Sequence, residues 1–226
     1  GTTWSYTITG LVEGANGITV TATDTAGNTA TASGSITLDT MAPTVSMNSV
    51  TSPTTVTSQT ITGTVEAGAT VSVVTNTAAS DGPAVVSGTS WSYTITGLVA
   101  GVNSITVTAT DTAGNTATAS GAITLDTTAP TVSLNAVTSP TKVTSQTITG
   151  AVEAGATVSV VTNTAASDGT ATVSGTTWSY TITGLVEGAN GITVTATDTA
   201  GNTAMASDTI TLDTTAPTVS LNAVTS

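Results

Sequence analysis

Apolar and polar residues alternate along much of this chain. Between Ser104 and Thr110, apolar side chains occupy every second position, and serine or threonine fills the positions between them. A period of two is typical of a β-strand with one buried face, whereas an amphipathic helix repeats every 3.6 residues. Trp91, Tyr93 and Ile95 share one face in the same way and are expected to point inward. The pattern therefore predicts an all-β chain without helices.

Seven such segments lie between residues 41 and 127, separated by stretches rich in Gly, Pro, Asp, Asn and Ser that are typical of turns. Seven short strands in a segment of this size favour an immunoglobulin-like β-sandwich, in which two antiparallel sheets pack face to face. The predicted strands are residues 44–48, 56–65, 70–76, 84–87, 91–95, 104–110 and 116–125.

The whole pattern recurs with a period of 87 residues, which is the spacing of Trp4, Trp91 and Trp178. Residues 41–127 and 128–214 are identical at 73 of 87 positions. Solenoid units usually have about 20–50 residues, so a period of this length fits a small whole domain better. The chain is therefore expected to be a string of tandem immunoglobulin-like domains.

The repeat divides the chain into four parts. Because the first part would be about half a domain with an exposed core, we expect further repeats on both sides of this sequence. The expected parts are 1–40, the C-terminal part of a repeat; 41–127 and 128–214, two complete repeats; and 215–226, the first strand of a following repeat.

One position breaks the alternation. Gly121 lies at an inward position of its strand, and the equivalent residue of the next repeat is Asp208. A charge is not expected in a core, so we predict a β-bulge there or a location near the end of the domain. Met47 and its equivalent Leu134 are also at an inward position, where similar volumes make the exchange tolerable.

Composition excludes several classes of function. The chain has thirteen acidic residues, one basic residue (Lys142), no His and no Cys, and a formal net charge of −12. It therefore lacks the usual zinc ligands, thiolate nucleophiles and imidazole bases. One Lys and no Arg offer no surface for nucleic acid phosphates, and no apolar run approaches the roughly 18 residues of a membrane span. We expect a non-enzymatic protein that neither binds nucleic acid nor inserts into a membrane.

The carboxylates recur at a few positions of the repeat: in the linker after the last strand, at the start of Asp-Thr-Ala-Gly-Asn, and in Val-Glu-Ala-Gly-Ala. The last two of these positions are loops, and in an immunoglobulin-like sandwich both lie at the tip where the linker enters. We therefore expect the side-chain oxygen atoms of the two loops and of the linker to converge. Three carboxylates in one cleft need a counter-cation, and an oxygen-only ligand set suits Ca²⁺. The predicted metal ligands are Asp24, Asp39, Glu66, Asp111, Asn115, Asp126, Glu153, Asp198, Asn202 and Asp213.

Simpler interpretations of the polar residues stay open. Asp-Thr-Ala-Gly-Asn makes a sound hairpin turn without metal, and a linker Asp adds solubility. Asp81 and Asp168 precede a glycine in an ordinary turn, and the carboxylate of Glu13 and Glu187 is dispensable because the middle repeat has Ala100. Outward threonines are typical of solvated strand surface, with ice binding and O-glycosylation as alternatives.

The motifs of one repeat resemble the tandem bacterial Ig-like domains of giant surface adhesins. They are Trp-Ser-Tyr-Thr-Ile-x-Gly-Leu, Ile-Thr-Val-Thr-Ala-Thr-Asp-Thr-Ala-Gly-Asn and Leu-Asp-x-x-Ala-Pro-Thr-Val, and the resemblance covers the whole chain. It implies a long stalk at the bacterial cell surface. It also implies interdomain Ca²⁺ at a linker Asp and adjoining loop acids, which here would be Asp39, Glu66 and Asp111, then Asp126, Glu153 and Asp198.

We therefore expect an extracellular structural stalk rigidified by calcium, whose partners are the adjacent repeats of the same chain. An alternative is a self-assembling filament or biofilm-matrix subunit formed by lateral association, because the threonine-rich surface carries few charges to oppose contact. A carbohydrate-binding module would need exposed aromatic side chains, and an enzyme would depend on a carboxylate pair.

Overall fold

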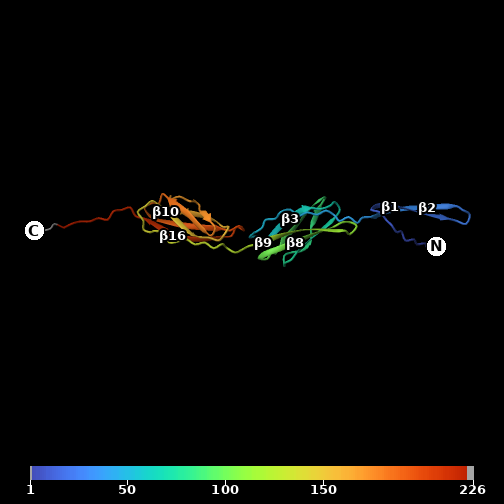
Figure 1. Ribbon diagram of the computed structural model, residues 1–226, viewed down its shortest axis with the longest axis horizontal. Helices are drawn as coiled ribbons and strands as arrows, with labels where there is room; N and C mark the ends of the chain where they lie inside the picture. Colours follow the sequence, from blue (N-terminus) through green and yellow to red (C-terminus); the bar gives the residue numbers. More distant parts are fainter. Residues whose placement is uncertain (1, 223–226) are drawn as a thin grey trace. The chain divides into compact units, whose positions relative to one another are not determined.

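The computed structural model describes residues 2–222, and within that range it consists of sixteen β-strands and no helix (Figure 1). The predicted all-β class is confirmed. These residues accordingly contain no helix long and apolar enough to cross a membrane. Contacts divide the chain into two compact units, one formed by residues up to Thr51 with Val56–Ile123, the other by Ser52–Thr55 with the chain from Thr124 onward.

A two-stranded hairpin, drawn in blue in Figure 1, comes first in the chain. β1 (Gly14–Thr23) pairs antiparallel with β2 (Thr29–Leu38) over their full length. Trp4 and Tyr6, before the hairpin, are 70% and 81% exposed, whereas the equivalent Trp91 is buried. The aromatic residues of this first part thus lie on the surface.

The segment that follows contains two sheets. The three-stranded sheet has the order β3-β7-β6, and the four-stranded sheet has the order β5-β4-β8-β9. Its strands are β3 (Ser58–Thr64), β4 (Thr70–Thr75), β5 (Gly82–Pro83), β6 (Val85–Ser87), β7 (Ser90–Thr96), β8 (Gly101–Thr110) and β9 (Thr116–Leu125).

The next repeat has the same two sheets, in the orders β10-β14-β13 and β12-β11-β15-β16. The equal topology follows from the near-identity of the two sequences. The strands are β10 (Ser145–Ala151), β11 (Thr157–Thr162), β12 (Gly169–Thr170), β13 (Thr172–Ser174), β14 (Thr177–Thr183), β15 (Gly188–Thr197) and β16 (Thr203–Leu212).

Each pair of sheets encloses one core. In the second sandwich, Trp178 and Ile182 of β14 pack into the same buried cluster as Val160 of β11, Val194 of β15 and Ile210 of β16. All five side chains are at most 2% exposed, and they stand at alternate positions of their strands. The alternating pattern thus buries one face of each sheet, which is the arrangement of a β-sandwich.

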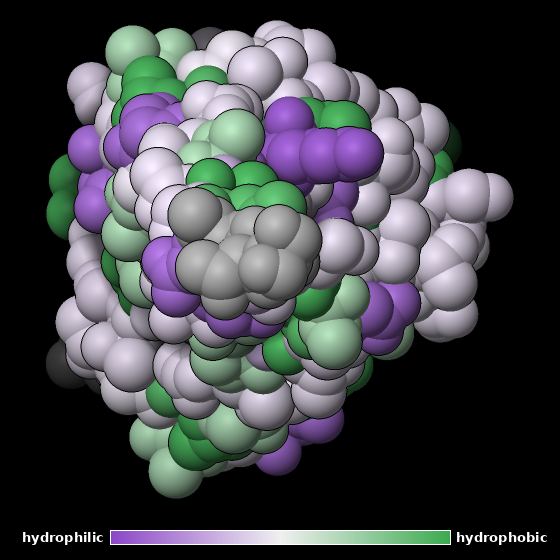
Figure 2. All heavy atoms as spheres, turned by 90° about the vertical axis from the view of Figure 1, so that its left-hand side faces the viewer, coloured by the Kyte–Doolittle hydropathy of each residue, from purple (hydrophilic) through white to green (hydrophobic). Residues whose placement is uncertain are grey.

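The outward faces carry mostly Thr and Ser. Hydroxyl groups pair across strands, as between Oγ1 of Thr60 and Oγ1 of Thr94, 2.9 Å apart. Figure 2, which views the side of the molecule at the left of Figure 1, shows mostly intermediate hydropathy with strongly polar and apolar residues scattered over it.

The predicted strands differ most from the observed ones in three places. Residues 44–48 form only an isolated bridge, Val45 to Val65, although they also bond to β3. β8 begins at Gly101, three positions before the predicted start at Ser104. The prediction missed β5, because its residues Gly82–Pro83 read as a turn and pair with β4 over two residues only.

Of the two explanations predicted for Asp208, a β-bulge is wrong, and the residue does lie in the last strand of its repeat. β15 and β16 pair in unbroken register, with Ile192 opposite Asp208. β16 is the edge strand of its sheet, and Asp208 is exposed there. The carboxylate avoids burial because it lies at an open edge, not because the strand bulges.

A glycine in β3 allows the tryptophan to reach its hydrogen-bond acceptor. The indole Nε1–H of Trp91 donates to the carbonyl oxygen of Ser46 at 2.9 Å. A Cβ placed on Gly63 would collide with that carbonyl oxygen and lie 2.7 Å from Nε1 of Trp91. The side chain of Trp91 is only 2% exposed, so the indole N–H would otherwise be buried without a partner.

Candidate functional site

The loop after β8 is organised around one carboxylate. Oδ1 of Asp111 accepts hydrogen bonds from the backbone N–H groups of Ala113, Gly114 and Asn115 at 2.7–2.9 Å. Its Oδ2 accepts a hydrogen bond of 2.9 Å from Nδ2 of Asn115. The Asp therefore closes its own turn, and Asn115, four residues later, is held against it.

The same contacts lower the pKa of these aspartates. For Asp111 the side-chain hydrogen bond from Asn115 is the largest cause and holds the pKa below its ordinary value of 3.8. For Asp198 desolvation is the largest single influence and raises the pKa, but the hydrogen bonds from Asn202 and the backbone N–H groups outweigh it and lower the pKa. Both groups are therefore stabilised as carboxylates by donors of their own loop.

The amide of the loop Asn also binds the linker that precedes the repeat. Nδ2 of Asn115 donates to the carbonyl oxygen of Asp39 at 3.1 Å, 76 residues earlier in the chain. In the next repeat Nδ2 of Asn202 donates to the carbonyl oxygen of Asp126 at 2.9 Å. We call this contact the linker clasp: an Asn Nδ2 bridging a loop Asp carboxylate and a linker Asp carbonyl.

The linker Asp side chains have a local role of their own. Oδ1 of Asp39 accepts from the N–H of Met41 at 3.1 Å, Asp126 from Thr128 at 3.0 Å, and Asp213 from Thr215 at 3.0 Å. Each linker therefore begins with a turn in which the Asp side chain caps the backbone two residues on. Their carboxylates were predicted as metal ligands, and one oxygen of each is engaged in this turn.

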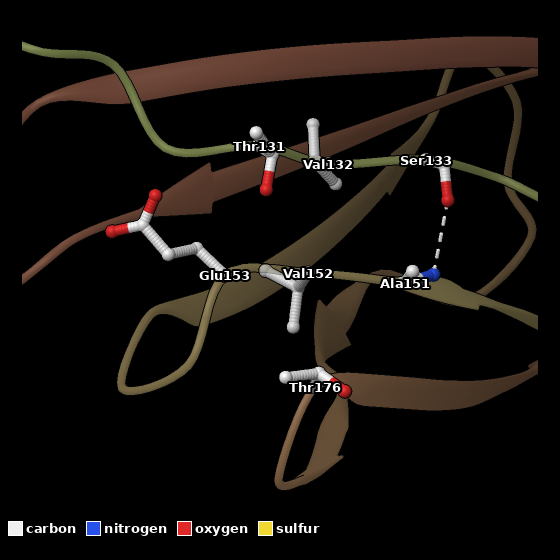
Figure 3. A pocket seen from close by; sticks show the side chains of 7 residues that line it. All are labelled: Thr131, Val132, Ser133, Ala151, Val152, Glu153 and Thr176. Carbon is white, nitrogen blue, oxygen red and sulfur yellow. Dashed lines mark hydrogen bonds between the residues drawn. The ribbon is translucent and has the colours of Figure 1, made fainter.

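Glu66 and Glu153 come just after β3 and β10 in the chain, and their backbone lies beside the segment that enters the repeat. The N–H of Glu153 donates to the carbonyl oxygen of Thr131 at 3.0 Å, and Glu66 makes the same bond to Thr44. Figure 3 shows Glu153 at the rim of a shallow pocket whose other labelled side chains are Thr, Ser, Val and Ala, and its carboxylate is the only one drawn there. Its backbone, rather than its carboxylate, connects it to the linker.

The predicted ligands come together only in part. Within residues 2–222, no three acidic side chains gather closely enough to hold one metal ion. In each clasp the amide N–H₂ group donates both to a carboxylate oxygen and to a carbonyl oxygen. Asp24 and Asn28 of the hairpin make the same pair, at 2.8 Å. The hydrogen bonds of the clasp join the loop to the linker.

Two further polar contacts were missed by sequence reasoning. Glu187, regarded as dispensable, accepts hydrogen bonds from N–H and Oγ1–H of Thr214 at 3.2 and 2.7 Å, and Glu13 does the same with Thr40. Each Glu precedes its linker Thr by 27 residues, and the two strands between them form a hairpin. This spacing could have predicted the contact. Asp168 instead accepts from N–H and Oγ1–H of Thr162, which supports the turn interpretation.

Acid is expected to weaken the clasp loops. A carboxylate whose pKa is lowered on folding contributes stability above its ordinary pKa, and this contribution is lost as the pH falls through the lowered value. The melting midpoint should therefore fall as the pH drops below 3.8, the ordinary pKa of Asp198. Replacement Asp198→Asn should lower the midpoint at pH 7, and the difference from wild type should shrink as the pH falls below 3.8 and the wild-type carboxylate takes up a proton. A difference in calorimetry that stays constant as the pH falls would contradict this role of the carboxylate.

Comparison with protein families gives a match over most of the chain. The model of a family described as bacterial Ig-like domain matches residues 46–127 and 135–214. A second model, bacterial Ig-like domain (group 3), matches residues 87–173. No curated protein matches the chain. The two matched segments of the first model end at the last residues of the two predicted repeats.

Several solved structures resemble the chain. Fibronectin(III)-like modules of CbhA from Clostridium thermocellum share 18% identity, with 75% of this chain and 94% of that chain covered and a TM-score of 0.48. A structure from a 1.5-MDa bacterial ice-binding adhesin shares 24% identity, with 89% and 76% covered and a TM-score of 0.46. A tetra-tandem repeat from the extending region of a large adhesion protein shares 25% identity, with 90% and 58% covered and a TM-score of 0.36.

Proposed function

Because the chain belongs to the bacterial Ig-like domain family, we propose that it is a segment of a non-catalytic stalk of tandem repeats on the outside of a bacterial cell. The observation that carries this proposal is the linker clasp, which recurs at the same position of both complete repeats. A domain that binds its own entering linker is suited to transmit load along a chain. The partners in this function are the adjacent repeats of the same polypeptide.

Localisation and linker binding provide the tests. Antibodies raised against the repeats should label intact cells of the source bacterium, and external protease should remove the signal. In solution, Asn202→Ala should increase hydrogen exchange of the linker after β9, while Asn163→Ala, which changes an Asn that bonds within its own sandwich to the N–H of Gly191, should leave the linker unchanged. Labelling only after cell lysis would refute the stalk.

We also propose that Ca²⁺ strengthens the linkers, through the carboxylates of Asp111 and Asp39 and of Asp198 and Asp126. Support comes from the oxygen-only donor set. It also comes from the lack of basic side chains to neutralise the carboxylates, since Lys142 is the one basic residue of the chain. An ion that binds only the folded state adds RT ln(1 + [L]/Kd), about 2.7 kcal/mol at a hundredfold excess over Kd.

Removal of calcium tests this second proposal separately. The melting midpoint should rise with Ca²⁺, fall with EDTA, and cease to respond in Asp111→Asn/Asp198→Asn. Mg²⁺ serves as the control, since it prefers a stricter octahedral geometry and keeps more of its waters. An unchanged midpoint with Ca²⁺ and EDTA would leave the amide clasp as the whole connection and remove calcium from the proposal, without affecting the localisation test.

A self-assembling filament or matrix built from the same repeats is the second candidate, favoured by the sparsely charged threonine surface. Electron microscopy of the secreted protein separates the two candidates. Uniform filaments of constant diameter would favour assembly, and isolated strings would favour the stalk.

A further inference from the structure

The free edges of the sheets are protected in different ways. An exposed strand edge can pair with another chain, and proteins usually shorten it, cover it, or place Pro or a charge on it. β6 and β5, at two of the edges, have three and two residues, and β5 contains Pro83. The edge of β3 is covered, because the N–H groups of Ser46 and Asn48 donate to its carbonyls.

β9 is not protected in any of these ways over most of its length. This strand of ten residues, Thr116–Leu125, forms the outer edge of its sheet beyond β8 and contains no charged residue and no Pro. Only its end is covered: the N–H of Thr124 donates to Oγ of Ser52, and its carbonyl oxygen accepts from the N–H of Thr54.

The uncovered part of β9 presents a regular row of backbone groups. Because backbone direction alternates along a strand, residues two apart face the same side. The N–H and C=O groups that share the outward direction of Thr124 belong to Thr116, Thr118, Ser120 and Ala122. Within the part of the chain that the structure describes, no loop or neighbouring segment makes a backbone hydrogen bond to these groups.

The equivalent edge of the next repeat is blocked by a carboxylate. β16 carries Asp208 where β9 has Gly121, and Oδ1 of Asp208 accepts a hydrogen bond of 2.7 Å from the N–H of Thr209. Thr209 has the same outward direction as Thr211, whose N–H donates to Oγ of Ser139. Asp208 therefore occupies an edge donor and adds a charge, which is a known way of protecting an edge strand.

The residue that packs against this position also differs between the two repeats. A Cβ on Gly121 would collide with Cε of Met47, so the long side chain fills the space that the glycine leaves. In the repeat with Asp208 the equivalent residue is the shorter Leu134. Gly121 with Met47 and Asp208 with Leu134 therefore form two alternative edge arrangements on one fold.

We propose that β9 is a docking edge for β9 of a second copy of this chain, the two strands pairing antiparallel about a twofold axis. Pairing Thr116 with Ala122 and Thr118 with Ser120 aligns all the free groups and allows about eight hydrogen bonds. The register stops at Thr124, whose backbone groups already have partners.

The edge is complementary to a second copy of itself, because in this register every free N–H of one strand lies opposite a free C=O of the other. The net charge of −12 opposes contact between two copies, and this opposition is smallest at a strand without charges. β9 is an uncharged stretch, and the side chains that would face each other across the axis are Thr, Ser, Ala and Gly, which permit close approach of two backbones. This inference goes beyond the stalk and does not depend on it.

The test compares edge variants in the full chain. All samples carry Gly34→Asp, because β2 has the same uncharged pattern and a Cβ on Gly34 meets no atom within 4 Å. Sedimentation equilibrium should show the mass rising with concentration from 21.7 kDa toward twice that value. The amide protons of Thr118, Ser120 and Ala122 should exchange more slowly at high concentration than at low concentration, and those of β16 should not change.

Variants identify the strand responsible. Gly121→Asp with Met47→Leu transplants the protected arrangement onto β9 and should abolish association. Asp208→Gly uncovers β16 and should produce species larger than a dimer. Ser72→Asp adds a negative charge on the central strand β4 and should leave association unchanged.

The outcome is decisive in both directions. Calorimetry checks that each variant is folded, and Ser120→Lys, at an exposed side chain of β9, replaces the double variant if that one unfolds. A chain that stays at its monomer mass up to millimolar concentration overturns the proposal. So does association that is equal in the edge variants and in Ser72→Asp. Either result leaves the cell-labelling test of the stalk untouched.

Discussion

Replacement of Gly150 by Ala is expected to lower the melting midpoint of the repeat at residues 128–214 by about 15 °C, while the preceding repeat melts as before. Gly150 lies in β10 opposite Trp178, whose Nε1–H donates to the carbonyl oxygen of Ser133 at 3.0 Å. A Cβ on Gly150 would collide with that carbonyl oxygen and lie 2.6 Å from Nε1 of Trp178. The added methyl group therefore cannot coexist with this hydrogen bond.

The size of the effect follows from two costs. Overpacking a core typically costs about 1–3 kcal/mol, and a buried donor left without an acceptor costs about 1–3 kcal/mol more. Trp178 is 2% exposed, so water cannot replace the lost acceptor. For a domain of this size each kcal/mol shifts the midpoint by about 4–8 °C. A total near 3 kcal/mol gives the expected decrease.

Gly191→Ser is the matched control in the same domain, because the other complete repeat has Ser104 at that position. Calorimetry of the full chain reports both domains, and the indole N–H resonance of Trp178 reports the bond itself. A midpoint within 2–3 °C of wild type, with the Trp178 indole proton still protected from exchange, would contradict the close contact between β10, Trp178 and the segment at Ser133.

Most of the fold could be predicted because it depends on alternation and repetition. β9 was predicted with its observed bounds, and β4, β6 and β7 to within about one residue at each end. The short strand β5 could not be predicted, because two residues containing Gly and Pro carry no period. The edge position of Asp208 also lay beyond the sequence, since strand order within a sheet is not encoded in the alternation of one strand.

The residues of the linker clasp could be predicted from the sequence, but the hydrogen bonds that join them could not. The turn closed by Asp111 was one of the two interpretations that the motif allowed, and its hydrogen bonds are present. Asn115 was taken as an oxygen ligand, whereas its amide nitrogen is the group that binds the linker. Oxygen and nitrogen share one side chain, so residue type alone could not distinguish an acceptor from a donor.

A buried asparagine was missed although its signal was present. Asn103 and Asn190 stand on the same alternating face as core residues such as Ile105 and Ile192, and both are fully buried. A polar residue on an inward face, repeated at one position of the repeat, indicates a built hydrogen-bond network. Nδ2 of Asn190 donates to the carbonyl oxygens of Val186, Gly188 and Ile210 at 2.8, 3.1 and 3.3 Å.

The other end of this side chain is an acceptor. Oδ1 of Asn190 accepts from the N–H of Val186 at 3.0 Å and from Oγ1–H of Thr164 at 2.9 Å. The amide thus ties the loop before β15 to the edge strand β16 and to the loop after β11. No other side chain of similar size offers two donors and an acceptor in this geometry, which makes the position sensitive to the exchange of a single atom.

Asn190→Asp is therefore expected to destabilise the repeat strongly at pH 7, by about 3–5 kcal/mol, and to reverse its response to acid. The carboxylate would face three carbonyl oxygens in a buried site, at the cost of breaking a buried polar network. Desolvation and the carbonyl dipoles raise the pKa of such an Asp above its unfolded value, so the folded state binds the additional proton more tightly and gains stability as the pH falls. Wild type is expected to lose stability on acidification, because the pKa values of Asp111 and Asp198 are lowered.

Asn163→Asp provides the control, since Oδ1 of Asn163 accepts from the N–H of Gly191 at 2.7 Å and a carboxylate can accept the same bond. This variant should keep its midpoint at pH 7 and lose stability toward pH 3 as wild type does. Melting curves of the three proteins between pH 3 and pH 8 thus separate a donor requirement from a general effect of added charge. If Asn190→Asp matched Asn163→Asp at every pH, the amide of Asn190 could not be the donor that joins the two loops to β16.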